Sequence, residues 1–256
     1  MAATMICATA KAQSPDEKYL AFEAYNGTDL ELTVDAKGTH FALWSPEAQA
    51  AQVQLYNSGL NTPAYSTLDM KKGEHGVWRA SVPEQLYGKF YTFRIKHNGK
   101  WLDPTPGIWA KAVGANGYRA AIIDFSKTNP EGWAADKGPK IDNITDAVIY
   151  EMHHRDFSVH PSSGIANKGK FLALTEEQTH SLLGDKTGIE HLKELGITHV
   201  HILPSYDYNS VDETNLPANQ YNWGYDPYNY NAPEGSYSTN PSDPATRVRE
   251  MKQMVK

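Results

Sequence analysis

Cysteine is almost absent from this sequence, which has one, Cys7, in 256 residues. A disulfide within the chain is therefore excluded, and the cysteine count says little about the compartment. Long apolar runs are also missing, since none approaches the roughly 18–20 residues that a membrane-spanning helix needs. The sequence has no Gly-rich phosphate loop and no basic patch interleaved with aromatic residues, so nucleotide and nucleic-acid sites have no support.

Basic residues are fewer than acidic residues in this sequence. The chain has 24 Lys and Arg against 30 Asp and Glu, for a net charge of −6. This acidic balance argues against nucleic acid or an anionic membrane surface as a partner. The hydrophobic content of 40% and charged content of 21% indicate a soluble globular protein with one large or two ordinary domains.

Residues 1–18 are expected to be a flexible leader or the remnant of a signal peptide. Ala10-Lys11-Ala12 resembles a signal-peptidase site. However, no basic region precedes it, and the stretch is shorter than a usual secretory signal. Secretion or export to a periplasm is thus a hypothesis, and a mature protein that begins at Met1 would contradict it.

Residues 19–137 are predicted to form an all-β domain with its linker. Short alternating runs at 39–44, 51–56, 76–82 and 90–96 are separated by turn residues, including Asn98-Gly99. Such spacing indicates an antiparallel, immunoglobulin-like sandwich. Four tryptophans bear on this domain: Trp44 and Trp78 are expected in its core because they fall within alternating strands, while Trp101 and Trp109 are left open between core and sugar platform.

Residues 138–256 are predicted to be the incomplete first portion of a (β/α)8 barrel. A strand at 147–152, a helix at 187–195 closed by Gly196, and a strand at 198–204 make a parallel strand-helix-strand unit. A further helix is expected to begin near Pro244, capped by Ser242 or Asp243. Because a complete barrel takes roughly 250 residues, we interpret the sequence as a truncated multi-domain enzyme.

The aromatic stretch from Tyr221 to Tyr237 has neither helical nor strand periodicity. Four of its first eight residues are aromatic, and Pro227 is expected to stop a regular ladder. The stretch is predicted to be an ordered loop after the second parallel strand, at the end where barrels place their active sites. Tyr and Trp rings suit sugars, which need flat apolar faces with polar edges, but such rings equally fill the edge of a core.

The run YNWGYDPYNYNAPEGSYS at 221–238 resembles the signature of type I pullulanases, in the alpha-amylase superfamily (glycoside hydrolase family 13). The segments 41–46, 76–83 and 101–104 resemble carbohydrate-binding module family 48. The resemblance implies a starch- or glycogen-debranching hydrolase. It would cleave α-1,6-glucosidic bonds of pullulan, starch or glycogen with retention of configuration.

In that family the nucleophilic Asp, the acid/base Glu and a third Asp lie on later strands, so the resemblance identifies no catalytic residue here. We therefore expect the 256-residue chain alone to be inactive. The resemblance implies that Tyr225 stacks on the sugar whose bond is broken, and that Trp223 and Asp226 contact hydroxyls or pack the loop. The predicted substrate-binding residues are Tyr221, Asn222, Trp223, Tyr225 and Asp226. Asn222, Asn229 and Asn231 are expected to hold the loop through backbone hydrogen bonds.

No cofactor is predicted, and metal sites have weak support. A zinc site built from His153, His154, His199 and His201 is disfavoured, although three His ligands can hold zinc. A calcium site that uses the oxygen-rich stretch 207–219 together with later residues is left open. His154 stands where an apolar residue is expected, and Arg155 and Asp156 are predicted to form a structural ion pair or turn contact.

Two other functions stay in view. One is a non-catalytic glucan-binding protein, which a sandwich and an aromatic loop permit but an open barrel disfavours. The other is a fragment of an isoamylase or branching enzyme, which the loop sequence at 221–227 disfavours.

Overall fold

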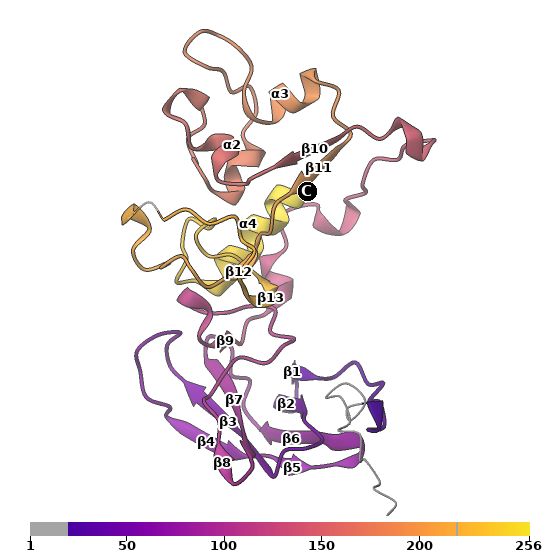
Figure 1. Cartoon of the computed structure of the whole chain (residues 1–256), viewed down its shortest axis with the longest axis vertical. Coiled ribbons are helices and arrows are strands. Elements are labelled where there is room, and N and C mark those ends of the chain that lie inside the picture. The colour runs from indigo at the N-terminus through magenta and orange to yellow at the C-terminus, as the bar shows by residue number, and fades with distance from the viewer. Residues whose placement is uncertain (1–19, 219) are drawn as a thin grey trace, which may run out of the picture.

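The computed structural model describes residues 20–218 and 220–256, so the predicted leader at 1–18 lies outside the described residues. A β-sandwich occupies one end of the molecule, and a pair of parallel strands with two helices occupies the other (Figure 1). The C-terminal helix and a small antiparallel sheet lie between them. The last residues of the chain therefore occupy the middle of the molecule.

The sandwich consists of two antiparallel sheets, as predicted. One sheet has the order β1-β2-β6-β5, and the other β4-β3-β7-β8 with β9 paired to β7. The first comprises β1 (Glu31–Asp35), β2 (Gly38–Trp44), β5 (Lys71–Lys72) and β6 (Val77–Val82). The second comprises β3 (Ala50–Tyr56), β4 (Ser66–Asp69), β7 (Phe90–His97), β8 (Lys100–Trp101) and β9 (Ala120–Ala121).

Alternation along the strands fills the space between these sheets. Phe41 of β2 and the Tyr91 and Phe93 rings of β7 form one aromatic group in the core, and the Phe41 and Tyr91 ring centroids are 5.2 Å apart. Trp78 is buried, with its Nε1 donating to the Ser45 carbonyl at 2.8 Å. The four tryptophans thus separate: Trp78 is in the core, Trp44 is half-buried, and Trp101 and Trp109 are exposed.

The predicted turn at Asn98-Gly99 forms a hairpin that joins β7 to β8. His97 pairs with Lys100, so the turn contains two residues, Asn98 at φ 48° and Gly99 at φ 76°. Positive φ at both central positions is the requirement of the type I′ turn, which Asn-Gly meets with little strain.

The predicted parallel unit is also present. β10 (Ile149–Met152) and β11 (His199–Ile202) pair in parallel, with Ile149 opposite His199. The connection contains α2 (Asp156–Val159) and α3 (Gly188–Glu194). Gly196 follows α3 at φ 73°, and its N–H donates to the Lys193 carbonyl, so it closes the helix as predicted.

The loop prediction was wrong for part of the aromatic stretch. β13 (Pro227–Pro233) pairs antiparallel with β12 (Tyr206–Tyr208), and the register shifts twice along the pair. Pro227 begins the strand rather than stopping it, because a proline at the first strand position costs no central ladder bond. The irregular register hides the period of two that normally reveals a strand.

The C-terminal helix α4 (Pro244–Val255) joins the two ends of the molecule. Its cap is Asp243, whose side chain accepts from Ala245 N at 3.2 Å. Val248 packs with residues of the sandwich, while Met251 packs against the cluster that contains Tyr237. Short 3-10 turns complete the fold, at Glu74–Gly76, Ala115–Gly117, Phe125–Thr128, Trp133–Ala135, Ile144–Asp146, Pro161–Ser163, Phe171–Thr175 and Leu216–Ala218. Among the residues described, no helix combines the length and apolarity needed to cross a membrane.

Candidate functional site

The aromatic loop, residues 221–226, lies beside the carboxyl ends of β10 and β11. Gly224 has φ 88°, and a Cβ there would lie 2.7 Å from the carbonyl oxygen of Pro204, just beyond β11. His153, just beyond β10, contacts the Asn222 carbonyl through Nε2 at 2.8 Å. Glycine at position 224 thus lets the loop pack against the strand ends.

Hydrogen bonds within the loop are made by two of the five predicted residues. Asn222 Oδ1 accepts from Gly224 N at 2.7 Å, and its Nδ2 donates to Asp226 Oδ1 at 2.6 Å. Asp226 Oδ2 accepts from the Ser210 N–H at 3.0 Å and from the Ser210 hydroxyl. Both side chains therefore make hydrogen bonds that shape the loop, which is the role expected of Asn222 and one of the two expected of Asp226.

The electrostatics of Asp226 agree with this internal role. Burial works to raise the pKa of Asp226, but hydrogen bonds from Ser210 and Asn222 outweigh it, and the pKa lies below its usual value. A carboxylate that accepts several hydrogen bonds is stabilised in its charged form. The ionised side chain of Asp226 thus links the loop to Ser210 by hydrogen bonds.

The other three predicted residues present their rings to solvent. The exposed fractions are 52% for Tyr221, 59% for Trp223 and 66% for Tyr225. The Tyr221 ring also packs on the His153 ring, with centroids 5.2 Å apart. The geometry therefore offers aromatic faces above a loop whose backbone is fixed by its polar side chains.

The amides after the loop tie it to the sandwich. Asn229 Nδ2 donates to the Gly117 carbonyl at 3.0 Å and to Asp207 Oδ2 at 2.7 Å. Asn231 Nδ2 donates to the Ile108 carbonyl at 2.8 Å. The predicted bonds from side chain to backbone are confirmed, but two of the three reach across to residues before 120.

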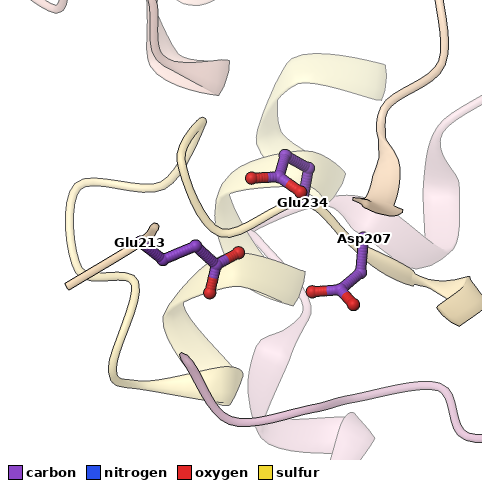
Figure 2. A group of neighbouring side chains, drawn as sticks. All are labelled: Asp207, Glu213 and Glu234. Atoms are coloured by element: carbon purple, nitrogen blue, oxygen red, sulfur yellow. The ribbon is translucent and has the colours of Figure 1, made fainter. Parts of the chain in front are cut away.

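A buried carboxylate cluster lies next to this junction. Asp207, Glu213 and Glu234 point toward one another (Figure 2), and each offers an oxygen within 4.8 Å of the others. Arg247 of α4 pairs with Asp207 at 3.4 Å and more closely with Glu213. The oxygen-rich stretch 207–219 was the one hint of this cluster in the sequence, since no local pattern pointed to Glu234 or Arg247.

The pKa values in the cluster reflect an excess of acids over bases. Burial and the Glu213 charge raise the pKa of Asp207 to about 7, against favourable contacts from Asn229 and Arg247. Burial, with the charges of Glu213 and Asp207, raises the pKa of Glu234 well above its usual value. The charge of Glu213 is thus one cause of the raised pKa of both Asp207 and Glu234.

Asp207, Glu213 and Glu234 by themselves do not fit a calcium ion, and a calcium site that uses 207–219 with later residues stays a prediction. All the carboxylate oxygens already accept hydrogen bonds from protein donors, and the cluster has a cation in Arg247. The donors are Asn229 and Arg247 for Asp207, Arg247 and the Gly235 and Asn116 N–H groups for Glu213, and the Tyr208 and Ser236 N–H groups for Glu234. Within residues 20–218 and 220–256, this is the only acidic, His or Cys group near enough to hold an ion, so the four histidines do not gather.

The segment after β10 adds two observations. Arg155 Nη1 pairs with Asp156 Oδ1 at 3.0 Å, as predicted. His154 is 1% exposed between the rings of Phe171 and Tyr237. Burial and the His153 charge lower the pKa of His154 to about 4, and the nearby Lys170 backbone opposes this shift only in part. His154 thus occupies the apolar environment that its position predicted.

Comparisons with known proteins support the resemblance. The family described as carbohydrate-binding module 48 (isoamylase N-terminal domain) matches residues 29–110. The pullulanase of Bacillus subtilis (strain 168) is 42% identical over 233 residues, which are 91% of this chain and 31% of that protein.

Two solved structures agree. The pullulanase from Paenibacillus barengoltzii in complex with maltohexaose and alpha-cyclodextrin is 49% identical, with a TM-score of 0.87 over 90% of this chain and 36% of that one. The pullulanase from Bacillus acidopullulyticus is 40% identical, with a TM-score of 0.87 over 94% of this chain and 29% of that one. The chain therefore spans about a third of the length of these three relatives.

Proposed function

We propose that this chain, an N-terminal pullulanase region with a family 48 carbohydrate-binding module, serves a debranching hydrolase that cleaves α-1,6-glucosidic bonds. The proposal is supported by the family match at 29–110 and by the pullulanases that resemble nearly the whole chain. Its substrates would be α-glucans such as pullulan, starch and glycogen. One of the similar structures is a complex with maltohexaose and alpha-cyclodextrin.

We propose two domains in this chain. The sandwich and its linker span 19–137, and the first portion of a (β/α)8 barrel spans 138–256. The parallel pairing of β10 with β11 supports the barrel portion. So does the exposure of Val148 (46%), Ile149 (66%) and Val200 (41%), because strands of a parallel sheet are normally covered on both faces. Further strands and helices of a complete enzyme would cover these residues.

The aromatic loop is the proposed sugar-binding element. Trp223 and Tyr225 expose flat faces beside the carboxyl ends of the parallel strands, and this observation carries the site proposal. Tyr225 would stack on the sugar at the cleaved bond, with Tyr221 beside it. Asn222 and Asp226 would act by holding the loop in shape.

The catalytic carboxyls of the proposed reaction are not assigned to this chain. A retaining glycosidase needs a nucleophile and an acid/base roughly 5–5.5 Å apart and open to substrate. Asp207, Glu213 and Glu234 are close together but at most 4% exposed, and they are occupied by internal donors. We therefore expect no hydrolysis from the chain alone.

Maltotriose binding to the purified chain, measured by titration calorimetry, tests the site. Tyr225→Ala and Trp223→Ala should each weaken binding about three- to tenfold, the effect expected for one aromatic contact. Tyr87→Ala, which removes an exposed ring of the sandwich, should leave the affinity unchanged. Absence of binding by the wild type, or equal affinity in all variants, would refute the loop as a sugar site.

Incubation with pullulan separates the enzymatic part from a purely binding role. The chain alone should release no reducing ends, whereas the complete polypeptide of the native locus should release them. If the complete polypeptide binds maltotriose without hydrolysing pullulan, the non-catalytic glucan-binding function replaces the proposed one.

A further inference from the structure

His153 connects the carboxyl end of β10 to the aromatic loop. Its Nε2 lies 2.8 Å from the carbonyl oxygen of Asn222, a residue 69 positions further along the chain, and its side chain is 8% exposed. The Asp156 N–H donates to Nδ1 at 3.3 Å. Nδ1 also lies 3.5 Å from Asp156 Oδ2. Because a carbonyl oxygen can only accept, the bond to Asn222 requires a proton on Nε2, and Nε2 is therefore the donor.

The bond from His153 acts on the loop through Asn222. Its carbonyl is fixed by His153, while its side chain binds both Gly224 N and Asp226. The neighbouring Tyr221 packs its ring on the His153 ring. His153 therefore holds the start of the loop, directly before the exposed Trp223.

We propose that His153 is a positioning residue for sugar binding, which acts by holding Asn222 so that Trp223 and Tyr225 present their faces in one arrangement. This inference rests on the proposed function of the loop and deepens it. A ring held in place before the sugar arrives loses less conformational entropy on stacking. The bond from Nε2 to Asn222 thus favours affinity without contact between His153 and the sugar.

A second explanation of this histidine is simple packing. Its ring centroid lies 6.3 Å from that of Tyr237, whose hydroxyl is 3.3 Å from Nε2. A packing role depends on the shape and apolar area of the ring, whereas a positioning role depends on a donor at the place of Nε2. Two amide substitutions separate these roles, because a Gln amide nitrogen can reach the place of Nε2 and an Asn side chain reaches only the place of Nδ1.

Hydrogen exchange at the Gly224 amide, which donates to Asn222 Oδ1, reports directly on loop order and can be measured by NMR. His153→Asn should speed this exchange about fivefold, the effect of one lost hydrogen bond of ordinary strength. His153→Gln should restore it to within about twofold of wild type. His201→Asn and His201→Gln are matched controls, because His201 lies on β11 with a side chain 67% exposed, and they should change nothing.

Equal exchange rates in His153→Asn and His153→Gln would overturn the proposal. Amides of β3 and β7 check the integrity of the sandwich in every variant. If His153→Asn does not fold, Tyr221→Leu distinguishes packing from the hydrogen bond. This variant removes the ring that packs on His153 but keeps the bond from His153 to the Asn222 carbonyl. Its Gly224 amide should remain like wild type, and fast exchange in this variant would favour packing over the hydrogen bond.

Maltotriose affinity gives the second readout. His153→Asn should bind about fivefold more weakly and His153→Gln like wild type, in proportion to the change in exchange. An unchanged exchange rate of the Gly224 amide in a folded His153→Asn variant overturns the role of His153, whatever the maltotriose affinity of that variant is. Absence of maltotriose binding by the wild type instead overturns the proposed function, so the two failures are distinguishable.

Discussion

Arg247 and Glu213 form a two-point ion pair in the interior of the molecule. Nη1 of Arg247 donates to Glu213 Oε1 at 3.1 Å, Nη2 donates to Oε2, and both side chains are 1% exposed. Glu213 also accepts from the Asn116 N–H at 2.7 Å. One carboxylate thus joins the C-terminal helix to the turn at Ala115–Gly117, which precedes β9 of the sandwich and lies 97 residues before Glu213.

Loss of Arg247 should be strongly destabilising. Arg247→Met keeps much of the side-chain volume but leaves Asp207 and Glu213 without their cation, and breaking a buried pair costs about 3–5 kcal/mol. Urea unfolding followed by fluorescence measures this free energy. Arg249→Met, on the same helix but only partly buried, should cost less than about 0.5 kcal/mol. Similar losses in both variants would show that the cluster does not depend on its arginine.

The second prediction concerns pH and Glu31. Burial raises the pKa of Glu31 to about 7, against hydrogen bonds from Tyr91 and from the backbone of Trp109 and Gly107. The folded state therefore holds this proton from the ordinary value of 4.5 up to about 7, where the unfolded state has lost it. Glu31 thus lowers the free energy of unfolding by as much as ~1.4 kcal/mol per pH unit as the pH rises through this window.

Glu31→Gln should make the slope shallower by the contribution of Glu31, because an amide does not titrate, while the contribution of Asp207 should remain. The comparison is the pH dependence of chemical unfolding between pH 5 and about 7, not the stability at one pH. Glu84→Gln, at an exposed site, should keep the slope of wild type. An identical slope in wild type and Glu31→Gln would mean that Glu31 is ionised throughout.

The third prediction concerns His154, whose pKa of about 4 lies below its ordinary 6.5. Above 6.5 the ring is neutral in both states, but as the pH falls toward 4 the unfolded state takes up a proton that the folded state resists. Stability is therefore lost across this window. Neither ring nitrogen has a hydrogen-bond partner among the described residues, so an apolar side chain avoids this cost.

His154→Leu should be at least as stable as wild type at pH 7, and its advantage should grow as the pH falls from 6.5 to 4. Thermal unfolding across this range measures the difference. His199→Leu, at an exposed position of β11, should show no such growth. A constant offset between His154→Leu and wild type at every pH would contradict the burial of a neutral histidine.

Asn229 offers a fourth test. Asn229→Leu removes two buried hydrogen bonds, to the Gly117 carbonyl and to Asp207, and should lower the free energy of unfolding by about 2–3 kcal/mol. Asn231→Leu removes a single exposed bond to Ile108 and should cost less than about 1 kcal/mol. Calorimetric unfolding compares the two, and equal costs would argue against Asn229 as the stronger tie to the sandwich.

The strands of the sandwich were predictable because they are encoded locally. β3 and β7 alternate apolar and polar residues within one element, and β2 and β6 are short runs rich in apolar residues between turns. The Asn98-Gly99 turn likewise depends on two adjacent backbone conformations. β13 was missed because its pairing with β12 is irregular, and irregular pairing leaves no repeat in the sequence.

The candidate site was likewise predictable from the sequence only in part. The aromatic residues 221, 223 and 225 could be singled out from composition and from the family resemblance. Their exposure, and the inward turn of Asn222 and Asp226, depend on partners at Ser210 and His153. No pattern within the loop contains those partners.

By itself, the sequence determined the two kinds of sheet, the type I′ hairpin and the resemblance to pullulanases, because neighbouring residues carry that information. The tertiary structure alone decided that Arg247 donates hydrogen bonds to acids 34 and 40 positions away and that Asn229 ties the strand after the loop to the sandwich. The physical reason is that a buried charge or amide is satisfied by whichever groups the fold brings within about 3 Å. Distance along the chain does not enter that requirement.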